Sequence, residues 1–179
     1  MYPVRLESKS VALREFRDDD TRSLVRVYGD AEATRHLSFE PKSHDEIGMV
    51  VSAAISAAHV EPRNEYMLAV ADIATDELVG VGRLALGEQR SGQIGFALRP
   101  DQWGSGKGTE VVRLLQRLGF ASLSLHRIWG ARSPINTASA KTMITAGMIE
   151  EGTIRGHLFT RGAWRDSIVH SILEGEYLS

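Results

Sequence analysis

Apolar residues along the chain follow two spacings, one typical of helices and one typical of strands. From Ile47 to Ala58 they recur every three or four positions, after a capping box formed by Ser43 and Glu46, so this segment predicts an amphipathic helix. The same spacing predicts further helices at 18–28, 30–36, 107–118 and 134–146. We interpret the acidic run 18–20 as the cap of the first helix rather than as a metal site.

Other segments alternate apolar and polar residues, as strands do. They are 11–16, 66–71, 78–86, the stretch from Gln93 that ends at Pro100, 127–132, 148–157 and 167–174. Gly95 permits a β-bulge in the fourth of these strands. This order of elements predicts a mixed α/β sandwich, formed by a single domain over residues 1–179, rather than a doubly wound sheet.

Composition narrows the classes of function. The formal net charge is −2, so the chain has no overall basic field that would recruit nucleic acid. The absence of cysteine excludes a thiol nucleophile, a cysteine-based zinc site and a disulfide framework. The first residues lack the apolar core of a signal peptide, and no apolar run approaches membrane-spanning length. We therefore expect a cytoplasmic protein without a metal, nucleic-acid or membrane partner.

The most informative segment is a glycine-rich loop, WGSGKG at 103–108, which lies between a strand and an amphipathic helix. Glycines leave the backbone without side chains, and together with the unpaired N–H groups of a helix N-terminus they form an anion site. Lys107 is expected to add a mobile positive charge. The spacing fits neither a Walker loop nor a dinucleotide-binding fingerprint. Taken alone, the loop is also compatible with a left-handed turn that binds no ligand.

Four blocks in order make the chain resemble the GNAT acetyltransferase superfamily, specifically its ribosomal-protein N-terminal acetyltransferase branch. They are Arg14 after the first strand, WGSGKG, the N-x-x-S element of Asn136 and Ser139, and Gly162 to Asp166 before the last strand. The resemblance covers nearly the whole chain. It implies a central mixed, mostly antiparallel sheet of about seven strands flanked by helices, acetyl-CoA as co-substrate, and an amine acceptor. It is also compatible with a homodimer.

The resemblance further implies roles for individual residues. Asn136 would bind the cofactor arm, and Ser139 would lie near its sulfur as the general acid, although Asn and Ser at this place also cap helices. Thr142 is a weaker candidate for the acid, and Lys141 for a phosphate ligand. The implied cofactor-binding residues are Phe96, Ala97, Leu98, Trp103, Gly104, Ser105, Gly106, Lys107, Gly108, Thr109, Asn136 and Ser139.

The general base is less well specified. His157 is our first choice, because the resemblance places it in the acceptor cleft, which it builds from 20–37 and 157–164. Other candidates are Glu88, Asp101, His126 and Glu151, while we interpret His36, His44, His59 and His170 as structural or exposed histidines. The aromatic residues Phe159 and Trp164 belong either to this cleft or to the core.

The expected class of amine acceptor depends on how strong the general base is. An α-amine has a pKa of about 7.7–8.0 and a lysine amine about 10.4, so an enzyme with a poorly specified base favours an α-amine. We expect a protein N-terminus as acceptor, with a polyamine, aminoglycoside or amino acid as close alternatives. Two other classes stay open: a non-catalytic acyl-CoA-binding sensor or subunit, and an unrelated nucleotide-binding domain.

Overall fold

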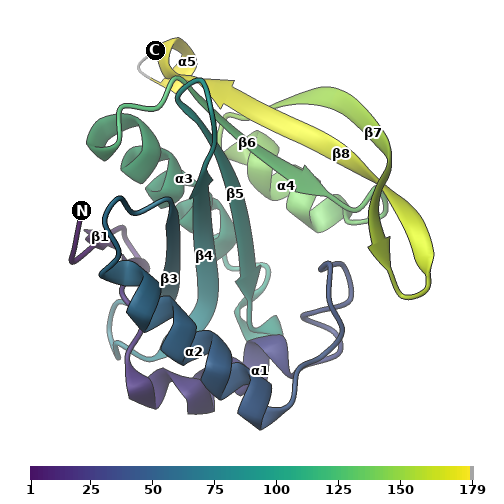
Figure 1. The fold of residues 1–179 in the computed structure, drawn as a ribbon. Helices are drawn as coiled ribbons and strands as arrows, with labels where there is room; N and C mark the ends of the chain where they lie inside the picture. The colour runs from purple at the N-terminus through teal and green to yellow at the C-terminus, as the bar shows by residue number, and fades with distance from the viewer. Residues whose placement is uncertain (178–179) are drawn as a thin grey trace.

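A computed structural model describes residues 1–177 of the chain. Its eight strands form one sheet in the order β1-β2-β3-β4-β5-β6-β8-β7 (Figure 1). The strands are β1 (Arg5–Glu7), β2 (Val11–Arg14), β3 (Glu65–Asp72), β4 (Leu78–Leu86), β5 (Ser91–Leu98), β6 (Arg127–Arg132), β7 (Ile149–Thr160) and β8 (Ala163–Leu173). The helices are α1 (Thr21–Tyr28), α2 (His44–Ala58), α3 (Lys107–Arg117), α4 (Thr137–Thr145) and α5 (Glu174–Tyr177).

The helices cover the two faces of the sheet and bury two apolar clusters. Successive residues of β3 show the division, because Leu68 packs with α3 and α4 whereas Ala69 packs with α1 and α2. Residues of a strand point alternately to opposite faces, so each cluster lies on one face. The structure therefore confirms the predicted α/β fold, a mixed and mostly antiparallel sheet flanked by helices.

The sheet opens between its only parallel neighbours, β5 and β6. Their pairing runs from Ser91–Arg127 to Ile94–Gly130 and then stops, whereas β5 continues to Leu98 alongside β4. Figure 1 shows the two strands diverging below this point. The last residues of β5 consequently have one free side, next to the glycine-rich loop that follows them.

The structure corrects one predicted helix and specifies two further details, the number of strands and the absence of a bulge. The sheet has eight strands rather than about seven, because β1 has only three residues, two of them exposed, and so lacks a detectable pattern. Residues 31–36 form turns instead of a helix, and the Asp30 carboxylate accepts hydrogen bonds from the backbone N–H groups of Glu32 and Ala33. Finally, β4 and β5 pair in unbroken register, so Gly95 carries no bulge.

The acidic run also differs from its predicted role as a cap. Residues 18–20 form a short 3₁₀ turn, and no side chain of this run caps α1. The carboxylate of Asp20 is buried and forms two 2.8 Å hydrogen bonds to the guanidinium of Arg14. Among residues 1–177 no cluster of acidic and histidine side chains has the arrangement of a metal site. No helix in that range is long and apolar enough to cross a membrane.

Candidate active site

A cavity of about 500 Å³ lies at the open side of β5. Its walls come from the end of β5, the loop that leads into α3 with the start of that helix, one side of α4 along its length, and the turns at 32–37. Ten of the twelve predicted cofactor-binding residues line it: Phe96, Ala97, Leu98, Trp103, Gly104, Gly106, Gly108, Thr109, Asn136 and Ser139. Ser105 and Lys107 do not. The cavity thus brings together segments that are far apart in sequence, while the role of each residue in binding a cofactor stays a prediction.

Two glycines of the loop are required by their backbone conformation. Gly104 has a φ of +73° and Gly106 a φ of +85°, values that side-chain-bearing residues rarely adopt. Nothing lies within 4 Å of the position that a Cβ would occupy at either residue, so no packed side chain covers the loop there. Gly106 is the N-cap of α3, and the first N–H groups of this 11-residue helix have no partner inside the helix. The arrangement suits a phosphate.

Gly108 has a different role from the other two glycines. A Cβ at this residue would lie 3.3 Å from Cγ2 of Thr142, because α3 and α4 approach each other closely here. The third glycine therefore allows two helices to pack. It also brings Thr142, the weaker candidate for the general acid, to the wall of the cavity.

The polar side chains of the loop bind the protein itself. Trp103 donates from Nε1 to the carbonyl of Leu98 at 2.9 Å, and Ser105 donates to the carbonyl of Gln102 at 2.7 Å. Lys107 is not the mobile charge that the sequence predicts. Its ammonium is 2.9 Å from the Asp72 carboxylate, and this hydrogen bond holds the pKa of Asp72 below its usual value. The Lys107 side chain therefore fastens the loop to β3.

Asn136 and Ser139, the two polar residues of the N-x-x-S element, have different roles. Asn136 is the N-cap of α4, and its side-chain oxygen accepts a 3.0 Å hydrogen bond from the backbone N–H of Ser139. The capping role that the sequence left open is thus filled by Asn136. The Ser139 hydroxyl makes no such bond to residues 1–177 and lines the cavity, so it is available to a ligand.

A buried arginine supports the turn that precedes α4. Arg132, at the end of β6, donates from Nη1 to the carbonyls of Ser133 and Pro134 at 3.2 and 3.0 Å. Its Nη2 lies 3.1 Å from the Glu150 carboxylate. These contacts fix the backbone immediately before Asn136. No pattern in the sequence indicates this support, because Arg132 ends a strand of ordinary pattern.

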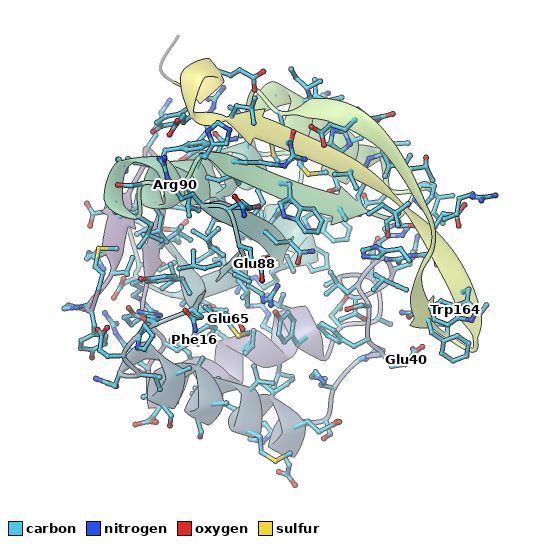
Figure 2. All side chains as sticks on the ribbon, turned by 45° about the horizontal axis from the view of Figure 1, so that its top comes forward. Phe16, Glu40, Glu65, Glu88, Arg90 and Trp164 are labelled. Atoms are coloured by element: carbon cyan, nitrogen blue, oxygen red, sulfur yellow. The ribbon has the colours of Figure 1, made fainter. Side chains whose placement is uncertain are left out.

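None of the predicted base candidates lines the cavity. Glu151 is bound by Arg127 and Ser171, and these hydrogen bonds lower its pKa to about 2. Asp101 is held by Arg99, which also lowers its pKa. Glu88 lies in the turn before β5 (Figure 2), at the opposite strand end from the cavity. His126 pairs with Glu174 3.1 Å away.

Two other histidines, His157 and His36, differ in position. His157 is partly buried on β7, and its Nδ1 has no hydrogen-bond partner among residues 1–177. His36 lines the cavity. Burial lowers the pKa of His36, and the charges of Arg35, Arg165 and Arg161 lower it further. The sequence-based interpretation of His36 as a structural or exposed residue therefore missed a neutral imidazole at the site.

The predicted acceptor segments do meet. Arg161, in the β7–β8 turn, donates to the carbonyl of Thr34 at 3.3 Å and pairs with Glu40 at 3.2 Å. Figure 2 shows Glu40 beside the end of the hairpin that carries Trp164. Phe159 and Trp164 pack edge to face with ring centroids 5.5 Å apart, and they are 61% and 70% exposed. These two aromatic residues are consequently not part of the core.

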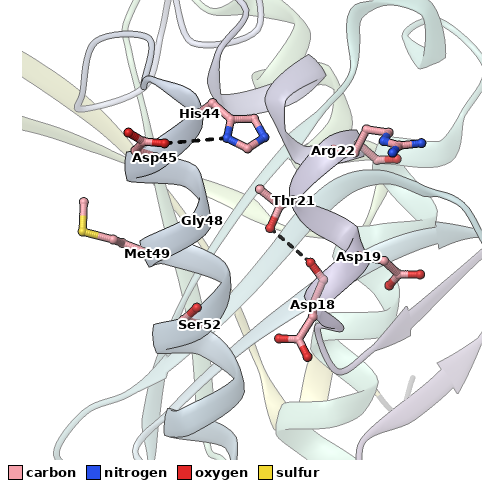
Figure 3. A pocket seen from close by; sticks show the side chains of 10 residues that line it. Asp18, Asp19, Thr21, Arg22, His44, Asp45, Gly48, Met49 and Ser52 are labelled. Atoms are coloured by element: carbon pink, nitrogen blue, oxygen red, sulfur yellow. Dashed lines mark hydrogen bonds and ion pairs between the residues drawn. The ribbon is translucent and has the colours of Figure 1, made fainter.

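A second, shallower concavity lies between α1 and α2 (Figure 3). Asp18, Asp19 and Asp45 contribute to it, together with Arg22 and His44. His44 lies 3.9 Å from the Asp45 carboxylate, and Thr21 donates to the carbonyl of Asp18. None of the predicted cofactor-binding residues lines this concavity, so it is separate from the cavity at β5.

Comparison with known proteins places this geometry in a family. A family model described as "Acetyltransferase (GNAT) domain" matches residues 10–149. The chain is 28% identical over 176 residues to the uncharacterized N-acetyltransferase YoaA of Bacillus subtilis. The aligned region covers 97% of this chain and 98% of that protein.

Two solved structures share the fold at low sequence identity. Spermidine N-acetyltransferase from Vibrio cholerae, in complex with CoA and spermine, matches with a TM-score of 0.79 and 22% identity over 94% of this chain and 98% of its own. RimJ of Mycobacterium smegmatis, in complex with CoA-disulfide, matches with a TM-score of 0.79 and 21% identity over 98% and 90%.

Proposed function

This chain belongs to the GNAT acetyltransferase family, and we propose that it transfers an acetyl group from acetyl-CoA directly to a primary amine. The acceptor that we favour is a protein N-terminal α-amine. The observation that carries this proposal is the single cavity that joins the glycine loop at the start of α3 to the turns at 32–37. A cofactor held at one end would present its reactive group to an amine that enters at the other.

The residues present fit the phosphates and the arm of acetyl-CoA. The first N–H groups of α3 supply donors, and the positive φ values of Gly104 and Gly106 keep the backbone open toward them. The chain has no cysteine, so no acetyl group can be held on a thiol of the enzyme. When bound, the cofactor supplies the thioester. This chain's residues position it, and they accept and donate the protons.

Two side chains on the cavity wall have suitable proton chemistry. The Ser139 hydroxyl is available as the general acid, because its neighbour Asn136 already caps α4. His36 is available as the base, since its lowered pKa keeps the imidazole neutral near pH 7. His157 remains the second candidate, in the hairpin that contacts the same turns.

For the acceptor, the shared fold supports two classes. One neighbour is named RimJ and another is a spermidine N-acetyltransferase, so we infer a Rim-type branch with small amines as the alternative. The test is acetyl-CoA consumption measured against N-terminal peptides and a panel of small amines. Binding of acetyl-CoA without acetylation of any amine would contradict the transferase proposal.

A further inference from the structure

Arg165 is a partly buried cation for which residues 1–177 provide no counter-ion. It lies on β8, and its Nη1 donates to the backbone carbonyl of His36 at 2.9 Å. No carboxylate of the described chain lies within ion-pair distance of its guanidinium. Its Nε has almost no accessible surface and no hydrogen-bond partner in the same part of the chain. Burying a charge without a partner is costly, and burial lowers the pKa of Arg165.

The other buried arginines of the protein behave differently. Arg14, Arg63, Arg99 and Arg132 are each 9% exposed or less. Their respective partners are Asp20, Glu15, Glu77 with Asp101, and Glu150. Each of these deeply buried arginines therefore has a carboxylate partner. Arg165, which is only partly buried, has none, and it lies where the hairpin contacts the turn at His36.

A second polar group beside Arg165 also lacks a partner. Ser167 follows two residues later on β8, so both side chains point to the same face of the strand. Ser167 is only 1% exposed, and its hydroxyl makes no hydrogen bond to residues 1–177. One unpaired guanidinium N–H and one unpaired hydroxyl therefore lie on the same face of β8, and both are groups that donate hydrogen bonds to carboxylates.

The surrounding charges favour an anion as well. Burial lowers the pKa of His36, and the charges of Arg35, Arg165 and Arg161 lower it further. The nearby acids are Glu40, paired with Arg161, and Glu32 on the cavity wall. Three cations therefore face two acids, and a polycation entering here would be repelled.

We propose that the amine acceptor carries a carboxylate close to its amine, and that Arg165, assisted by Ser167, binds this group and determines acceptor specificity. The inference rests on the proposed function, because it assumes that the acceptor enters beside His36. It favours a free amino acid or a peptide with an acidic residue near its N-terminus. It disfavours polyamines and aminoglycosides.

A matched pair of peptides tests the inference. The C-terminally amidated dipeptides Ala-Glu and Ala-Gln share the same free N-terminal residue and differ only in one carboxylate. A second pair, glutamate and its diamide, distinguishes a free amino acid from a peptide as the source of that group. We expect wild-type kcat/KM to be about tenfold or more higher for the acidic member of one pair. The variant Arg165→Met should abolish this preference by lowering kcat/KM for the acidic member to about that of the neutral member.

Two variants control this experiment. Arg155→Met removes an exposed arginine from the same hairpin and should keep the preference, while Arg165→Lys should restore part of it. An equal loss for both members of a pair would mean that Arg165 only holds the turn at His36, which would overturn the inference. Acetylation confined to polyamines or aminoglycosides would overturn it too, and would leave the transferase proposal intact.

Binding measurements cover the remaining outcomes. If acetyl-CoA binds but no amine is acetylated, calorimetry measures the affinity of the CoA-bound protein for N-acetyl-Ala-Glu. We expect Arg165→Met to weaken this affinity. An unchanged affinity in Arg165→Met would overturn the inference. If acetyl-CoA does not bind, the proposed function itself fails, and this inference with it.

Discussion

Arg132 donates from Nε to Nε2 of His170 over 3.0 Å, and both side chains are buried. Because Nε2 accepts this bond, the imidazole is neutral and carries its proton on Nδ1. The charged groups that face His170 are Arg132 and Glu150, whose carboxylate is 3.6 Å away. Arg132 also donates to the carbonyls of the turn before Asn136. The neutral His170 therefore helps to position this part of the cavity wall through Arg132.

The state of His170 leads to a prediction about stability and pH. Burial, and then the charge of Arg132, lower the pKa of His170 in the folded protein. The unfolded chain, with a histidine pKa of about 6.5, binds the proton first, so stability is complete above that pH and is lost as the pH falls below it. His170→Gln, which keeps an acceptor for Arg132 without titrating, should flatten the fall in unfolding free energy between pH 6.5 and 5.

Urea unfolding at a series of pH values measures this effect, with His44→Gln on α2 as the control for exchanging an imidazole for an amide. The wild-type slope contributed by one proton has a ceiling of about 1.4 kcal/mol per pH unit. An unchanged slope in His170→Gln would show that another group is responsible for the loss of stability in acid.

Gly106→Glu should abolish measurable binding of acetyl-CoA. The substitution forces a side chain into a left-handed conformation at φ +85° and places an anion at the start of α3, where a phosphate would bind. Gly162→Glu is the matched control, because its φ is +76° and it does not line the cavity. Calorimetry that finds both variants binding like the wild type would contradict the assignment of the loop.

Ser139→Ala should lower kcat by about 100-fold or more and change the affinity for acetyl-CoA much less. The reason is that the Ser139 hydroxyl lines the cavity without a bond to the described chain. Ser56→Ala, on the exposed side of α2, serves as control. An unaltered kcat would shift the role of general acid to Thr142 or to water.

Lys107→Met should destabilise the protein by about 1 kcal/mol and weaken acetyl-CoA binding only slightly. The ammonium is bound to Asp72, so its loss frees the loop from β3 rather than removing a phosphate ligand. Thermal unfolding and calorimetry of this variant are compared with Lys9→Met, which alters an exposed lysine. A large loss of affinity at unchanged stability would instead return Lys107 to the phosphate site.

His36→Ala and His157→Ala distinguish the two base candidates. Since the pKa of His36 is lowered, the acidic limb of the wild-type kcat/KM profile should lie below the ordinary histidine range, and His36→Ala should flatten it. His157→Ala should keep the limb. The reverse result would assign the base to His157, as the sequence alone suggested.

The sequence by itself determined the order of most elements and the cofactor half of the site. WGSGKG and N-x-x-S are local signals, because a left-handed glycine and a helix cap act over only a few residues. Ten of the predicted residues accordingly line one cavity. Apolar periodicity likewise predicted seven of the eight strands, and it missed β1 because three residues are too few for a pattern.

Only the tertiary structure decided which side chains are engaged elsewhere and which are left unpaired. Lys107 lies within the glycine loop, but its charge is bound by Asp72, 35 residues away in sequence. Arg165 and His36 are 129 residues apart and meet because the β7–β8 hairpin reaches the turns after α1. Such contacts depend on where β5 and β6 diverge and on the length of the hairpin, and neither leaves a periodic trace in the sequence.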